Sequence, residues 1–133
     1  MGRKILIGLV ILLAALAVAW FAGPRVAVDT KVTFDPARIG SDADVYLATQ
    51  EAGVPNIRED HQKEIVWADP ATKAKTPLAI VYVHGFSATK GEVRPLADKV
   101  AAALGANLFY TRLTGHGQDG AAMATGSVNA WVN

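Results

Sequence analysis

The stretch LAIVYVHGFSATKGEVRPLADKVAAALGANLFYTRL, residues 78–113, decides the fold that we predict for this chain. It opens with an apolar run, residues 78–83, whose lack of polar alternation is typical of a strand covered on both faces. Residues 92–104 then place apolar side chains at helical spacing. A second apolar run follows at residues 107–113. Strand, helix and strand joined by short loops predict a βαβ unit with a right-handed crossover in a parallel sheet.

The limits of these elements follow from proline and glycine. Pro95 is tolerated only in the first turn of a helix, so the helix is expected to begin near Val93 or Arg94. Gly105 is expected to end it. The segment EIVWA, residues 64–68, is a further short strand candidate. The predicted fold class is therefore α/β.

Composition excludes several classes of function. The 133 residues carry a formal net charge of +1, and the Lys and Arg residues are scattered, so no nucleic-acid partner is expected. The absence of cysteine excludes disulfides and thiolate metal sites. The three histidines, His61, His84 and His116, lack the i, i+4 spacing of a metal motif, and no Gly-Lys-Ser/Thr phosphate loop occurs. We therefore expect neither a metal nor a cofactor.

The first 23 residues differ from the rest of the chain. Residues 5–23 contain no charge, and at about 1.5 Å per residue such a helix approaches the ~30 Å hydrocarbon core of a bilayer. Trp20 and Phe21 at its far end suit the membrane interface. Arg3 and Lys4 before it favour a cytoplasmic N-terminus, which places the remaining domain on the outer side.

Two alternatives to this membrane anchor are open. A cleaved signal peptide has an apolar region of about 7–15 residues and a small-x-small site after it, and its removal would leave a secreted or periplasmic protein. Here the run is longer, and Ala15, Ala17 and Ala19 lie inside it. A buried core helix is the third possibility, and the absence of a polar face to meet water counts against it. The uncleaved anchor is favoured.

The chain between the anchor and the sheet is expected to be mostly connecting structure. Residues 25–35 form an extended linker or a first strand. The next segment, residues 40–55, contains a short helix that Ser41 or Asp42 can cap and that Gly53 ends. These patterns divide the chain into three parts: the anchor or signal segment 1–23, the linker and short helix 24–63, and an α/β domain 64–133.

The turn after residue 83 carries the chemistry. His84-Gly85-Phe86-Ser87 lies where the first parallel strand ends, the edge at which α/β proteins bind ligands. Gly85 permits a backbone shape that a Cβ would hinder. The amide N–H groups that follow can then point at one spot and stabilise an anionic oxygen. In a second interpretation, Ser87 is a nucleophile, but Thr89 replaces the last glycine of G-x-S-x-G. In a third, the turn only reverses the chain.

Residues 65–131 resemble the N-terminal part of an α/β-hydrolase of the serine esterase and lipase-like group. The resemblance rests on HGF (84–86), on the helix after it, and on RLTGHG (112–117). It implies that the Phe86 N–H is an oxyanion donor in the turn formed with His84 and Gly85. It also implies that Ser87 and His116 lie against a small-molecule ester or related acyl substrate.

The resemblance stops before the catalytic triad. Members of the family carry a G-x-S-x-G elbow, then an acid, then a histidine. The serines here, Ser41, Ser87 and Ser127, do not lie in such an elbow. We therefore expect a truncated hydrolase domain: the full-length parent would be a membrane-anchored serine hydrolase, with its nucleophile outside this chain, and the chain alone would be inactive. The alternative is a non-enzymatic membrane-anchored module that retains a hydrolase-like fold fragment.

Overall fold

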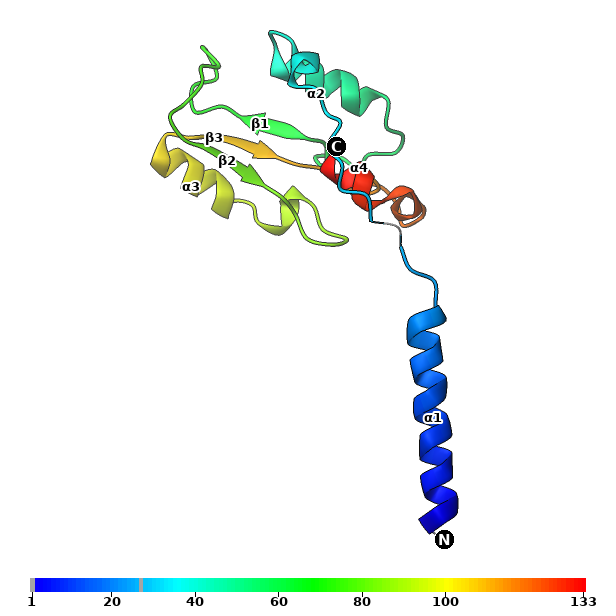
Figure 1. Ribbon diagram of the computed structural model, residues 1–133. Helices are drawn as coiled ribbons and strands as arrows, with labels where there is room; N and C mark the ends of the chain where they lie inside the picture. Colours follow the sequence, from blue (N-terminus) through cyan, green and yellow to red (C-terminus); the bar gives the residue numbers. More distant parts are fainter. Residues whose placement is uncertain (1, 27) are drawn as a thin grey trace.

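A computed structural model describes residues 2–26 and 28–133 as an apolar N-terminal helix and a small mixed α/β unit (Figure 1). The elements, in chain order, are α1 (Gly2–Ala22), the 3₁₀ helix η1 (Pro36–Ile39), α2 (Ala43–Ala52), β1 (Glu64–Val66), β2 (Ala79–Tyr82), the 3₁₀ helix η2 (Lys90–Glu92), α3 (Leu96–Leu104), β3 (Asn107–Tyr110), the 3₁₀ helix η3 (Ala121–Thr125) and α4 (Val128–Val132).

The sheet has the order β1-β3-β2. Strands β2 and β3 are parallel and are joined through α3, so the predicted βαβ unit is confirmed. Strand β1 runs antiparallel to β3, with Glu64 opposite Tyr110, so the prediction of a parallel sheet is wrong for this strand. The reason is the connection between β1 and β2, which contains no helix among residues 67–78 and turns back at one end of the sheet.

Helix α3 covers one face of the sheet with only part of its apolar surface. Ala101 is buried and Ala97 packs beside it, against Leu108 and Tyr110 of β3. The helix begins at Leu96, later than expected, with Pro95 as its N-terminal flanking residue. A second apolar stripe on α3 remains exposed, formed by Leu96, Val100 and Leu104. The core of this unit is therefore small.

Charged groups reinforce the small core where α3 and η2 meet β1. Lys90 is 2% exposed, and its Nζ lies 2.5 Å from Glu64 Oε2 and 3.1 Å from Asp60 Oδ1. Arg94 donates to the same Glu64 carboxylate at 2.7 Å. The Tyr110 hydroxyl donates to Asp98 Oδ2 at 2.7 Å. These bonds connect the η2–α3 segment to both β1 and β3.

The N-terminal helix and the linker lie outside this core. Helix α1 is 21 residues long and none of its described residues is buried, so its length and composition suit a membrane span or a signal sequence. The described residues between Arg25 and Asp35 form no strand, which leaves the linker rather than the strand interpretation. Asp42 caps α2 by accepting from the N–H groups of Asp44 and Val45, so of the two predicted caps it is Asp42 that acts.

Candidate functional site

The predicted oxyanion turn follows β2 directly. The Ala88 N–H donates to the Gly85 carbonyl at 3.1 Å, which closes a four-residue turn with Phe86 and Ser87 at its centre. Among the described residues, Ser87 has a φ of 60°, whereas Phe86 does not lie in the left-handed region, the pattern of a type II turn. The Phe86 side chain is 79% exposed at the tip. The turn thus projects an aromatic ring from the carboxyl end of a parallel strand.

The conformational strain of the turn lies at Ser87 and not at Gly85. A Cβ at position 85 would meet only Glu92 carboxylate oxygens, at 3.8 and 3.9 Å, which is ordinary contact. The expected steric need for glycine at this position is therefore wrong. A non-glycine residue in the left-handed region costs roughly 1–2 kcal/mol, and such strain is often found at functional sites.

The three amides of the turn differ in their partners. The Ala88 N–H is bonded to Gly85, and the Ser87 N–H donates to His116 Nε2 at 3.2 Å. The Phe86 N–H has no acceptor within the described part of the chain. The expected group of converging donors therefore reduces to one available donor, the Phe86 amide.

A pair of buried histidines supports the turn. His84 and His116 are 4% and 2% exposed, and their ring centroids lie 4.6 Å apart. His84 Nε2 accepts from the Leu113 N–H at 3.1 Å, just as His116 Nε2 accepts from Ser87. Since an accepting Nε2 is unprotonated, each neutral ring carries its proton on Nδ1, which lies 3.0 Å from the Gly85 carbonyl in His84 and 3.3 Å from the Thr114 carbonyl in His116. Burial lowers the pKa of His84, in keeping with this neutral form.

The loop around His116 is held by a buried ion pair that the sequence analysis did not single out. Arg112 Nε and Nη2 donate to the Glu51 carboxylate at 2.7 and 2.8 Å, and Arg112 Nη1 donates to the His116 carbonyl at 3.2 Å. Burial opposes ionisation of Glu51, but the Arg112 hydrogen bonds and charge leave its pKa below the ordinary value. The sequence carries no local signal for this pair, because Glu51 belongs to α2 and Arg112 to the loop after β3.

Gly115 within this loop and Trp131 of helix α4 are both closely packed around it. Gly115 has a φ of 83°, and a Cβ there would lie 2.7 Å from the Ala122 carbonyl oxygen, so only glycine fits. Trp131 of α4 packs edge-on against His116 with centroids 5.9 Å apart and donates from Nε1 to the Thr114 carbonyl at 3.0 Å. The Phe86 ring also lies edge-on to His116, with ring centroids 6.2 Å apart. The structure thus brings together all five predicted site residues: His84, Gly85, Phe86, Ser87 and His116.

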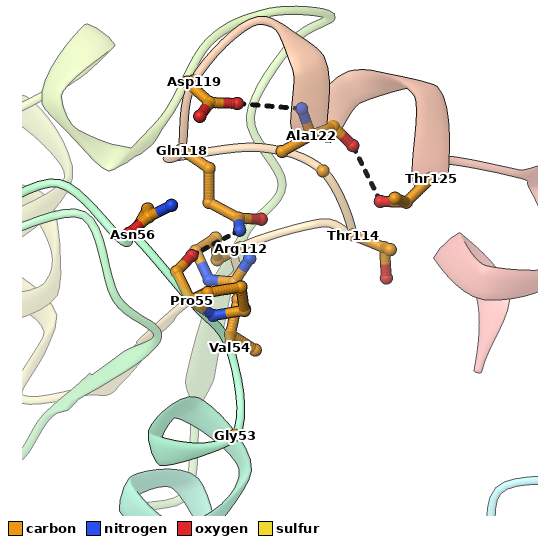
Figure 2. A pocket seen from close by; sticks show the side chains of 11 residues that line it. Gly53, Val54, Pro55, Asn56, Arg112, Thr114, Gln118, Asp119, Ala122 and Thr125 are labelled. Atoms are coloured by element: carbon orange, nitrogen blue, oxygen red, sulfur yellow. Dashed lines mark hydrogen bonds between the residues drawn. The ribbon is translucent and has the colours of Figure 1, made fainter.

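A hollow beside this loop is separate from the turn (Figure 2). It is an open cavity of about 340 Å³ between residues 53–56 and the loop from Arg112 to Thr125, and none of the five predicted site residues lines it. Its polar groups bond one another: Gln118 donates to the Pro55 carbonyl at 2.6 Å, and the Ala122 N–H donates to Asp119 at 3.0 Å. The two charged residues that line it, Arg112 and Asp119, are both already hydrogen-bonded.

Comparison of the chain with protein-family models, with curated proteins and with solved structures finds no match. The geometry of the turn is therefore the basis on which a function can be inferred.

Proposed function

We propose that this chain is the N-terminal part of a membrane-anchored α/β-hydrolase that cleaves ester or related acyl bonds. In this proposal the Phe86 amide donates to the oxygen of the acyl carbonyl as negative charge develops on it. A serine nucleophile, its base and its acid are not supplied by these 133 residues, so the chain alone is inactive.

The observation that carries the proposal is the state of the Phe86 amide. It lies on the turn that follows the carboxyl end of a parallel strand. The next two amides, those of Ser87 and Ala88, are already bonded, whereas the Phe86 N–H has no acceptor in the described residues. In α/β-hydrolases one oxyanion donor is an N–H from the loop that follows the corresponding strand. A fixed donor of this kind lowers the barrier without reorganising during the reaction, and losing one costs about 3–4 kcal/mol.

The bracing around the turn supports the same role. An oxyanion donor must keep its direction while charge develops on the substrate. Here Ser87 is bonded to His116, and His84 is bonded to Leu113 after β3, so two strands and their loops hold the turn. The backbone of His116 is in turn held by the hydrogen bond that Arg112 Nη1 donates to the His116 carbonyl.

The proposal includes the cellular position of the domain. Helix α1 would cross the membrane with Arg3 and Lys4 on the cytoplasmic side and with the α/β unit on the outer side. The competing proposal is a non-enzymatic anchored module. It agrees with the role of His84 and His116 in holding the turn, since the Nε2 atom of each ring accepts a backbone N–H.

Labelling of the full-length parent protein with a fluorophosphonate probe tests the proposal. The enzyme is expected to be labelled at a serine outside residues 1–133, within a G-x-S-x-G segment, and heat-denatured protein should not be labelled. Unlabelled native protein, or a coding sequence without such a segment, would instead support the anchored module.

A further inference from the structure

We infer that the Phe86 turn lies in the interface of the same bilayer that α1 crosses, so that the site faces acyl groups held in membrane lipids. The inference rests on the proposed anchor, and it deepens the proposed function by naming the membrane surface as the source of the substrate. It follows from how the linker is attached to the α/β unit.

The linker is docked on α4 at the C-terminal end of the described chain. The Asn133 side-chain oxygen accepts from the N–H and, at 2.8 Å, from the hydroxyl of Thr33, and its amide nitrogen donates to the Lys31 carbonyl at 3.0 Å. Asn129, one turn earlier, donates to Asp29 Oδ2 at 3.3 Å. The α/β unit is therefore attached from Asp29 onward.

Little chain remains between this attachment and the proposed membrane span. Seven residue steps separate Ala22, the end of α1, from Asp29, and they reach at most about 25 Å even when fully extended. Arg25 shortens this reach, because its Nη2 donates to the Trp20 carbonyl at 2.9 Å. A unit of about 100 residues has a radius of gyration near 13 Å. Asp29 is therefore held within about 25 Å of the end of the proposed span, and the end of the unit that carries it faces the membrane.

The Phe86 turn belongs to that end. Helix α4, which holds the linker through Asn129 and Asn133, also presents Trp131 to His116. His116 contacts Phe86 and accepts from the next residue in the turn. Figure 1 shows the linker passing beside α4 on its way to α1. Two successive aromatic contacts thus connect the docked linker with the turn.

The exposed side chains at this end suit a lipid surface. Phe86 is 79% exposed, and Val28 and Val32 of the linker are 71% and 64% exposed. Aromatic rings favour the membrane interface, and apolar groups at a surface indicate an interaction site. Because α1 would anchor the unit to the bilayer, the lipid surface is always within reach of the turn, unlike a second copy of the chain. The charges of the linker sum to zero, with Arg25 and Lys31 against Asp29 and Asp35, so anionic lipid is not required.

The experiment uses the complete chain, whose lack of cysteine permits single-site labelling. Phe86→Cys and the matched control Leu78→Cys each receive a nitroxide, and the proteins are reconstituted into phosphatidylcholine vesicles. Leu78 is 48% exposed and precedes β2, at the opposite end of the strand from the turn. Both positions are exposed, so neither label displaces a packed core residue.

The depth of the nitroxide in the bilayer is reported by the ratio of its relaxation by oxygen to its relaxation by a water-soluble nickel chelate. We expect this ratio to be at least threefold higher at position 86 than at position 78, with no change when phosphatidylglycerol is added. Equal ratios in protein that floats with the vesicles would overturn this inference alone. Spin–spin broadening at position 86 would show a second copy at the turn and would also overturn it. Protein that does not float would overturn both the anchor and the inference, whereas fluorophosphonate labelling of the parent tests the hydrolase separately.

Discussion

At the residue scale, the site depends on how a few polar atoms are shared. Of the turn amides, those of Ser87 and Ala88 are bonded and that of Phe86 is available within the described residues. The hydrogen bonds from Leu113 and Ser87 form only while His84 and His116 are neutral, since each Nε2 must accept a backbone N–H. The chemistry proposed for Phe86 is therefore coupled to the protonation of two rings that do not touch the substrate carbonyl.

This coupling predicts a dependence of stability on pH. Burial lowers the pKa of His84, the nearby Gly85 carbonyl and Glu92 raise it, and His116 and Arg112 lower it further. Because the unfolded chain takes up the proton first, the contribution of His84 to the free energy of unfolding should fall as the pH drops from about 6.5 toward the lowered pKa, and this contribution should not change further below it. Chemical denaturation between pH 5 and pH 8 measures this.

One variant controls the pH experiment. His84→Gln keeps an acceptor for Leu113 but cannot titrate, so the loss of stability between pH 6.5 and pH 5 should shrink. An identical pH profile in wild type and His84→Gln would contradict the role given to His84.

The strain at Ser87 leads to a second prediction. Ser87→Gly removes the cost of the left-handed backbone, so the free energy of unfolding should rise by up to about 1 kcal/mol. Ser87→Val should lower it by more than about 1 kcal/mol, because a β-branched residue is poorly accommodated at positive φ. Fluorophosphonate labelling of the full-length Ser87→Gly protein should persist. Lost labelling would instead identify Ser87 as the nucleophile.

At the element scale, local sequence patterns predicted the βαβ unit and the turn at its edge, because apolar periodicity and glycine or proline stops are local properties. The direction of β1 was not predictable in this way, since it depends on which end of the sheet the 67–78 connection occupies. The His84–His116 contact and the Glu51–Arg112 pair join separate elements, and neither has a local signature. The position of Phe86 was therefore predictable from the turn, whereas the groups that brace it were not.

The Glu51–Arg112 pair joins α2 to the His116 loop and predicts a large effect of mutation. Both side chains are below 10% exposed, so Glu51→Gln leaves a buried arginine charge and should lower the free energy of unfolding by about 3–5 kcal/mol. The exposed pair Lys73–Asp44 is the matched control, and Lys73→Gln should cost less than about 1 kcal/mol. Equal losses in the two variants, measured by urea denaturation, would contradict this account.

At the scale of the whole molecule, the α/β unit leaves much apolar surface uncovered. Among the described residues only Ala101, Ala106, Leu108 and Tyr110 are buried apolar residues. Strand β2 lies at one edge of the sheet order, and Val81 on it is 59% exposed. A small core with an open parallel edge is marginally stable and prone to association. A cooperative thermal transition of residues 24–133 would contradict that expectation.

The exposed stripe of α3 provides a test of this association. The triple variant Leu96→Glu, Val100→Lys, Leu104→Lys replaces the apolar stripe and adds an i, i+4 pair of opposite charges. Its aggregation, followed by light scattering of residues 24–133, should be weaker than that of the unmodified segment. Replacing Ala101 with Lys is the converse control, because burial of an unpaired charge should abolish folding. Unchanged aggregation in the triple variant would show that another surface is responsible.

The most direct test of the central claim removes the Phe86 N–H itself. Proline suits the second position of a type II turn and has no amide hydrogen, so Phe86→Pro deletes the donor and keeps the turn. Phe86→Ala deletes the ring and keeps the donor. In the full-length parent we expect kcat to fall about 100- to 1000-fold in Phe86→Pro and to stay within about threefold of wild type in Phe86→Ala. A Phe86→Pro enzyme as active as Phe86→Ala would contradict the claim.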